Sequence, residues 1–81
     1  MNIIILNLSR ETSEKELTEL FLTYGPVESC NIVMDKQSGQ SKGFGFVKMM
    51  DEDEAEAAII SLHGTELSGY KIRVKASTKT A

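Results

Sequence analysis

The chain has 81 residues, of which 41% are hydrophobic and 26% are charged, a mixture typical of one small folded domain. Nine lysines and arginines against twelve acidic residues give a formal charge of −3. Taken alone, this charge argues against a nucleic-acid partner, because nucleic-acid-binding proteins usually carry an excess of basic residues. The longest apolar run, residues 3–6, is far shorter than the roughly 20 residues of a membrane-spanning helix, so we expect no membrane partner.

The first 26 residues predict a strand followed by a helix. The run Ile-Ile-Ile-Leu at 3–6 is short and rich in β-branched residues, as expected of a central strand. Ser13, with Glu16 three positions later, forms a capping box at the start of a helix. Apolar residues then recur at helical spacing until Gly25-Pro26 ends the helix after about three turns.

The rest of the chain predicts two strands, a second helix and a last strand. Residues 27–34 and 42–49 are the two strands, and the polar segment 35–41 between them suits a long hairpin loop. Asp51 is positioned to cap the second helix, and residues 71–75 alternate charged and apolar side chains as a half-buried strand does. This order favours an α+β fold with both helices on one face of a mainly antiparallel sheet. The other face of the sheet is then open to a partner.

Residues 42–49, Lys-Gly-Phe-Gly-Phe-Val-Lys-Met, carry the strongest functional signal. Side chains alternate across a strand, so four of them share the face that we expect to be open: Lys42, Phe44, Phe46 and Lys48. Two phenylalanines between lysines suit stacking on unpaired bases, with the lysines near the phosphates. The alternative, that both rings belong to an ordinary core, is disfavoured by the glycines on the opposite face.

The segment 42–49 resembles the octamer of the RNA recognition motif family at seven of its eight positions. Residues 3–8, Ile-Ile-Ile-Leu-Asn-Leu, resemble the family's companion hexamer on the first strand. The resemblance covers residues 2–76, and the segment Asp-Lys-x-x-Gly-x-Ser-Lys at 35–42 is similar to that of small stand-alone bacterial members. It implies one ferredoxin-like βαββαβ domain over residues 1–76, with sheet order 4-1-3-2. We expect residues 77–81 to form a disordered tail.

The resemblance implies single-stranded RNA as the partner, bound on the open face, with no enzymatic activity, small-molecule substrate or cofactor. Phe44 and Phe46 are expected to stack on bases, and Ile4 and Leu6 to add apolar contact. The basic residues of the third and fourth strands are expected to contact phosphates: Lys42, Lys48, Lys71, Arg73 and Lys75. Two residues of the second strand are expected at the edge of the site: Asn31 and Val33. The loop at 35–42 is expected to close over the bound strand.

Two positions depart from the family pattern. Met49 stands where an aromatic residue is usual, but it is expected to face inward and to fill core space. Ile4 stands where an exposed aromatic is usual, which removes one stacking ring. Because each base–aromatic stack is worth about 1–3 kcal/mol, we expect a weak, sequence-tolerant binder. We also expect a monomer, and the pattern does not separate RNA from single-stranded DNA.

The charges are not spread evenly over the predicted elements. Most acidic residues fall in the predicted helices, in particular the run at 51–56. Basic residues predominate in segments 31–50 and 69–81, which contain the third and fourth strands. The sequence therefore predicts a basic sheet within an acidic molecule, so the net charge does not exclude RNA binding.

Other interpretations stay open. Ile4 and Leu6 could lie in the core with Ile3 and Ile5 exposed, although the hexamer register favours the reverse. The same apolar face would suit a protein–protein interaction module, which the missing aromatic at Ile4 favours. An acylphosphatase-like enzyme has the same topology, but only Arg10 suggests a phosphate cradle there.

The single cysteine, Cys30, and the single histidine, His63, give no disulfide framework and no metal-ligand cluster. Cys30 is interpreted as a small inward-facing side chain and His63 as a turn residue. A reducing cytoplasm fits this cysteine usage.

Overall fold

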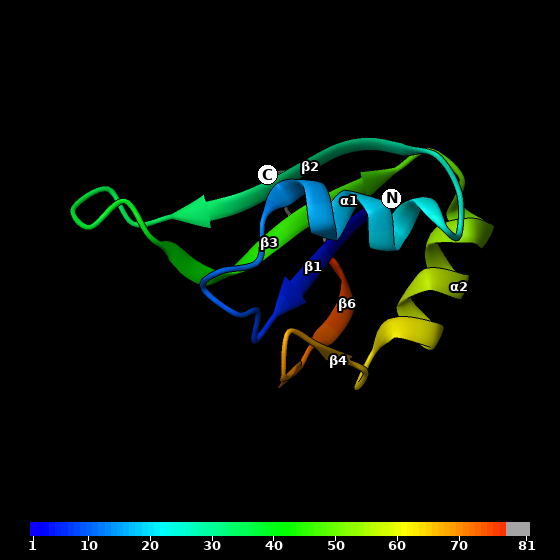
Figure 1. Ribbon diagram of the computed structural model, residues 1–81. Coiled ribbons are helices and arrows are strands. Elements are labelled where there is room, and N and C mark those ends of the chain that lie inside the picture. Colours follow the sequence, from blue (N-terminus) through cyan, green and yellow to red (C-terminus); the bar gives the residue numbers. More distant parts are fainter. Residues whose placement is uncertain (78–81) are drawn as a thin grey trace.

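The computed structural model describes residues 1–77, in which two helices cover one face of a four-stranded sheet (Figure 1). In chain order the elements are β1 (Asn2–Leu6), α1 (Glu14–Leu22), β2 (Val27–Met34), β3 (Ser41–Met49), α2 (Glu52–Leu62), β4 (Glu66–Leu67), β5 (Tyr70–Lys71) and β6 (Arg73–Ser77). The main sheet has the order β2-β3-β1-β6, and every neighbouring pair is antiparallel. This confirms the expected α+β fold and the order 4-1-3-2, with β6 as the fourth strand.

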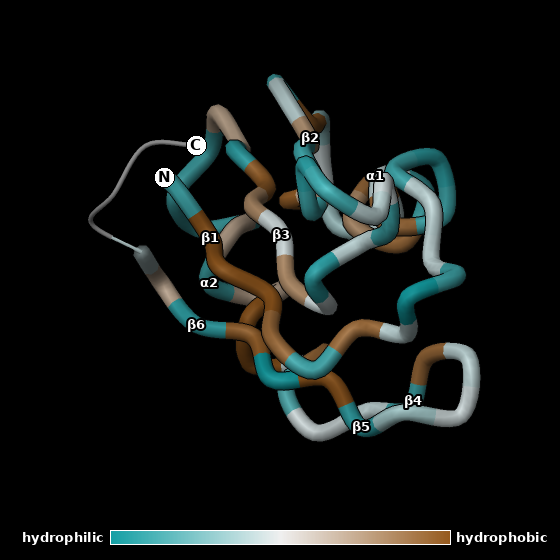
Figure 2. The backbone as a smooth tube through the Cα atoms, turned by 90° about the vertical axis from the view of Figure 1, so that its left-hand side faces the viewer, coloured by the Kyte–Doolittle hydropathy of each residue, from teal (hydrophilic) through white to brown (hydrophobic). Residues whose placement is uncertain are grey.

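The core lies between the helices and the inner face of the sheet. Alternate residues of the central strands point into it, and Ile3, Ile5 and Val47 have at most 1% of their surface exposed. They pack with buried residues of both helices: Leu17, Phe21, Ala55, Ala58 and Leu62. Figure 2 shows β1 as a mostly hydrophobic strand, coloured brown. The alternation predicted for β1 and β3 is therefore confirmed.

Both helices begin at the residues that the sequence predicts. The Ser13 hydroxyl accepts a hydrogen bond from the Glu16 backbone N–H at 3.1 Å, and the Asp51 carboxylate accepts one from Glu54 N–H at 3.0 Å. These side chains satisfy backbone donors that have no partner within the helix. No helix within residues 1–77 is long and apolar enough to cross a membrane.

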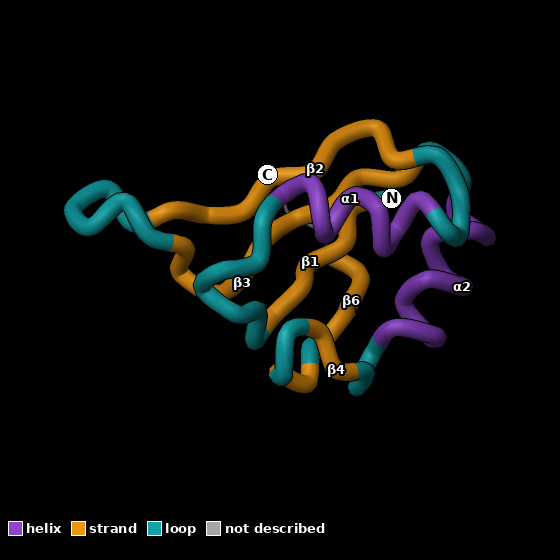
Figure 3. Tube along the Cα trace, in the orientation of Figure 1, coloured by secondary structure: helices purple, strands orange, loops and turns teal. Residues whose placement is uncertain are grey.

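The prediction of a strand at residues 71–75 is wrong at both ends. Residues 66–71 form a short hairpin of β4 and β5, in which Lys71 pairs with Glu66, and β6 begins only at Arg73 (Figure 3). The backbone at Ile72 causes the break, because its N–H donates to Thr65 and its carbonyl accepts from Gly64, and not from a strand of the main sheet.

The far end of β6 also extends further than expected. Ser77, placed in the disordered tail by the sequence, is the last residue of the strand and pairs with Asn2. The rest of that tail, residues 78–81, lies outside the described residues.

Candidate nucleic-acid interface

Phe44 and Phe46 lie side by side on the outer face of β3. Both rings are half-buried, with centroids 6.2 Å apart and planes at 80°, an edge-to-face arrangement. Gly45 between them is buried and faces the core side, against β2. A Cβ atom at Gly45 would lie 2.8 Å from the backbone oxygen of Asn31, so only glycine allows the two strands to approach this closely.

The outer face continues from these rings across all four strands. Asn31 on β2 pairs with Phe46, Phe46 pairs with Ile4 on β1, and Ile4 pairs with Lys75 on β6. In the next row Leu6 pairs with Arg73. Ile4 and Leu6 are half-buried while Ile3 and Ile5 are fully buried, so the alternative register, with Ile4 and Leu6 in the core, is wrong. We call the outward-facing residues of these rows, together with Phe44, the sheet surface.

The cations on this face differ in their surroundings. Lys42, Arg73 and Lys75 are exposed, and none of them forms an ion pair with another residue in the described part of the chain. Lys48 is also exposed, but its Nζ lies 3.8 Å from a carboxylate oxygen of Glu28. Three positive charges are therefore available to a phosphate chain, and the fourth is partly neutralised.

Glu28 reaches this face because β2 contains a bulge. Val27 pairs with Met49 and Ser29 pairs with Lys48. Between these two pairs β2 therefore has one residue more than β3. The extra residue, Glu28, is exposed beside Lys48. Bulges change the direction in which side chains point. Glu28 is not among the site residues that the sequence predicts.

The other predicted site residues lie at the margins. Asn31 is exposed beside Phe46, and Val33 is half-buried on the same edge strand. Lys71 is exposed but belongs to β5, so the expectation that it lines the main sheet with Arg73 and Lys75 is wrong. Lys71 lies outside the main sheet because the chain joins that sheet only at Arg73, after the β4–β5 hairpin.

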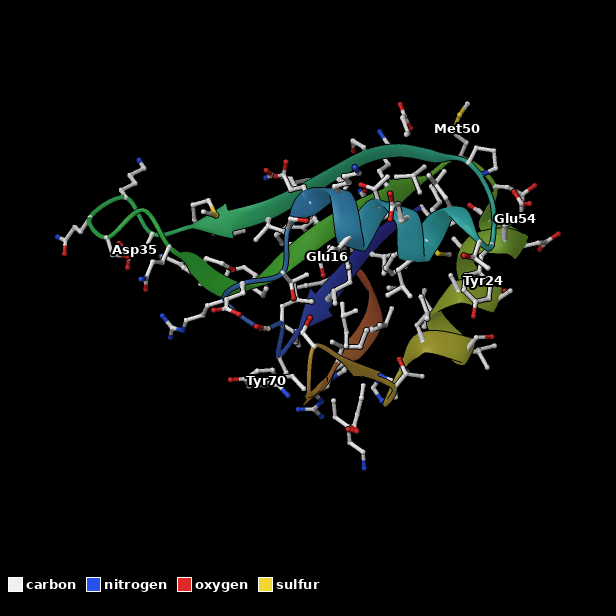
Figure 4. All side chains as sticks on the ribbon, in the orientation of Figure 1. Glu16, Tyr24, Asp35, Met50, Glu54 and Tyr70 are labelled. Atoms are coloured by element: carbon white, nitrogen blue, oxygen red, sulfur yellow. The ribbon has the colours of Figure 1, made fainter. Side chains whose placement is uncertain are left out.

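The loop between β2 and β3 has an ordered turn. Asp35 N–H donates to Gln40 O at 2.7 Å, and Gly39 N–H donates to Asp35 O at 2.8 Å. Backbone N–H groups of Gln37 and Ser38 lower the pKa of the Asp35 carboxyl, and the charges of Lys42 and Arg10 act in the same direction. Figure 4 shows Asp35 in the hairpin that projects beyond the sheet.

Cys30 and His63 have structural contacts. Burial raises the pKa of the Cys30 thiol, and the nearby Glu14 carboxylate adds to this effect against a hydrogen bond with Thr18. A thiol with a raised pKa is a poor nucleophile. His63 Nδ1 accepts a hydrogen bond from Val74 N–H at 3.1 Å, which fixes the end of α2 against β6. Residues 1–77 contain no cluster of His, Cys, Asp and Glu that could hold a metal ion.

Residues 3–73 match the RNA recognition motif family, and the chain belongs to that family. Its members are RNA-binding domains, so this chain is a binding domain and not an enzyme. Transformer-2 protein homolog alpha from Homo sapiens and from Mus musculus are each 41% identical over 78 residues, which are 95% of this chain. The chain spans 28% of the length of these curated relatives.

Solved structures show the same fold. The crystal structure of RNA-binding protein PG1 superposes with a TM-score of 0.96 at 41% identity, covering 100% of this chain and 98% of that one. The Sxl-lethal protein in a complex with RNA superposes with a TM-score of 0.91 at 29% identity, covering 99% of this chain and 48% of that one. Together with the family, these neighbours support RNA binding. The organisms named for the curated relatives are human and mouse, so the similarity to bacterial members stays a prediction.

Proposed function

We propose that the chain binds short single-stranded RNA across the sheet surface, with Phe44 and Phe46 stacking on two successive bases. The observation that carries this proposal is the pair of half-buried rings on the outer face, between apolar Ile4 and Leu6 and unpaired cations. Stacking tolerates any base because every base has a π-face, and the cations follow the phosphates. Binding of a labelled octanucleotide, followed by fluorescence anisotropy, tests the proposal directly.

The proposed binding is weak and of low sequence specificity. Ile4 occupies the middle of the row between Phe46 and Lys75, where a ring would have provided a third stacking surface. The cation of this row, Lys75, forms no ion pair in the described part of the chain and is available to a phosphate, and contacts with phosphate carry no sequence information. The same chemistry applies to single-stranded DNA. A monomer is sufficient, because one sheet carries all of these residues.

Changing Ile4 to phenylalanine is expected to raise affinity for the octanucleotide by about fivefold or more, since one added base stack is worth about 1–3 kcal/mol. Anisotropy titrations of both proteins measure the gain. Ile60→Phe is the matched control, because Ile60 is 79% exposed on α2, away from the sheet surface. Equal affinity of Ile4→Phe and the unaltered protein would contradict a stacking role for this position.

Glu28→Gln is expected to raise RNA affinity by about twofold to fivefold, because it releases Lys48 and removes a negative charge from the RNA path. The salt dependence should become steeper at the same time, as one more cation meets a phosphate. Glu19→Gln on the exposed side of α1 removes the same charge elsewhere and serves as the control. If both variants gain equally, the effect is one of net charge and Glu28 has no local role.

The logarithm of the affinity should fall by about 2 to 3 for each tenfold increase in salt, as expected for roughly three or four phosphate contacts with a single strand. Titrations at several salt concentrations measure this slope. A slope near zero would contradict the roles proposed for Lys42, Arg73 and Lys75.

A protein–protein interaction module is the alternative. Ile4 and Leu6 favour it, because an apolar outer face without its usual ring also suits a protein partner. If RNA leaves the sheet surface unperturbed and capture of a protein depends on Phe44 and Phe46, the alternative replaces the RNA proposal. The cytoplasm remains our expected location on the basis of the single cysteine.

A further inference from the structure

A pocket of about 650 Å³ lies at the end of the sheet where β1 ends and β3 begins. Three separate segments form it: the loop after β1, the first residues of β3 and the turn between β4 and β5. Its main side chains are Asn7, Arg10, Lys42, Ser68 and Tyr70. We call it the terminal pocket. Its volume is within the range of about 300–1,000 Å³ that small-ligand pockets have.

The terminal pocket adjoins the sheet surface through the chain itself. Asn7 directly follows Leu6, and Gly43 directly precedes Phe44. The backbone N–H of Leu8 donates to Gly43 O at 2.8 Å, which keeps the two strands together beyond the last residue of β1. A single strand stacked on Phe44 and continuing toward this end of the sheet therefore meets the pocket next.

Unusual backbone conformations converge on this pocket. Among residues 1–77, Asn7 and Ser68 are the only non-glycine residues with positive φ, at 62° and 53°, and both line it. Gly43, with φ of 85°, lines it as well. Such conformations persist only where the surroundings impose them, and they cluster at functional sites. The Asn7 side-chain amide donates to Lys71 O at 2.7 Å, which holds the loop against the β4–β5 hairpin.

The side chains of the pocket suit a nucleotide. The lining contains two exposed cations, Arg10 and Lys42, and one acid, Glu11, so it carries a net positive charge. The Asp35 carboxyl, whose pKa both cations lower, lies outside the lining. Tyr70 is 50% exposed and extends from the hairpin at this end of the molecule (Figure 4). An aromatic ring beside two cations is the combination that holds single-stranded nucleic acid elsewhere.

We propose that the terminal pocket binds one further nucleotide of the single strand, with its phosphate at Arg10 and Lys42 and its base against Tyr70. This inference rests on the proposed function, because the strand reaches the pocket from the sheet surface. It assigns a binding role to Arg10 and Tyr70, which lie outside the octamer and the hexamer.

Titration with uridine oligonucleotides of two and six residues tests the proposal. The dinucleotide should shift amide signals of the sheet surface, while the hexanucleotide should also shift those of Asn7, Ser68 and Tyr70. Arg10→Ala and Tyr70→Ala should each weaken hexanucleotide binding by about fivefold or more and leave dinucleotide binding within twofold. Both residues are exposed, so an unchanged unfolding midpoint will show that the fold is intact. Tyr70→Phe should bind as the unaltered protein does.

Lys15→Ala is the matched control, because Lys15 is an exposed cation on α1. If Lys15→Ala weakens hexanucleotide binding as much as Arg10→Ala, or if the pocket variants bind normally, the terminal pocket has no role. A Phe44→Ala/Phe46→Ala protein separates the two proposals. If it loses all binding while the pocket variants bind normally, the proposed function stands and the pocket inference fails. If the double alanine variant binds normally, the sheet-surface function fails, and the pocket inference that rests on it fails too.

Discussion

Replacing Phe44 and Phe46 together with alanine is expected to lower RNA affinity by at least about thirtyfold, to the limit of detection. Each base stack contributes about 1–3 kcal/mol, and the double variant removes two of them. The two rings also contact each other edge to face, with centroids 6.2 Å apart, so each helps to orient the other. Anisotropy titrations with a labelled octanucleotide measure the loss.

Two control variants show whether the loss of affinity comes from the two rings. Phe44→Tyr/Phe46→Tyr keeps both ring faces and should retain affinity within about threefold. Ile60→Ala removes a comparable apolar side chain from the exposed side of α2 and should have no effect on binding. The unfolding curve of the double alanine variant shows whether it is folded. If the folded variant still binds RNA within threefold of the unaltered protein, stacking on these rings is ruled out.

Gly45→Val is expected to lower the free energy of unfolding by about 3 kcal/mol. The new Cβ atom would lie 2.8 Å from Asn31 O and 3.2 Å from Ile32 Cα, and both are backbone atoms of β2 that cannot rotate away. Strand β2 must then move from β3, which costs typically 1–3 kcal/mol and occasionally more for an overpacked site. Urea unfolding, followed by circular dichroism, measures the change.

Lys48→Val places the same β-branched side chain on the same strand at an exposed position, and should change stability by less than about 0.5 kcal/mol. A Gly45→Val protein as stable as this control would mean that β2 accommodates the side chain. The octamer glycine would then have no steric requirement behind it.

The parts of the fold that the sequence predicts well depend on local signals. Ser13 and Asp51 act as helix caps over three or four residues, and the alternation of β3 follows from the residues of the strand itself. The outward direction of Phe44 and Phe46 therefore follows from the sequence alone. The outward direction of Ile4 does not, because the first strand admits two registers. The resemblance to the hexamer favours the outward one, and the burial of Ile3 and Ile5 in the structure decides it.

The features that the sequence does not predict depend on long-range pairing. Two-residue strands such as β4 and β5 are too short to have a periodic pattern, so Lys71 is assigned to the wrong strand. Glu28 joins the sheet surface only through a bulge, which is a property of two paired strands. The terminal pocket brings together residues near positions 7, 42 and 70, whose proximity no local pattern records. The Ser68-Gly69 pair is a turn signal and is the one local sign of this hairpin in the sequence.

The distribution of charge in the structure agrees with a binding face. Helices α1 and α2 have acidic first turns and no basic residue in their last turns, whereas the exposed cations Lys42, Arg73 and Lys75 lie on the strands. A chain with a formal charge of −3 can therefore present a positive face to RNA. The same net charge limits non-specific affinity, which agrees with the weak binding proposed above.

Backbone amide chemical shifts, followed by NMR while the octanucleotide is added, test the central claim most directly. We predict shifts over residues 3–7 and 42–48, small effects on α1 and α2, and no shifts with the Phe44→Ala/Phe46→Ala protein. Shifts confined to the helices, or equal shifts with that variant, would contradict RNA binding on the sheet surface.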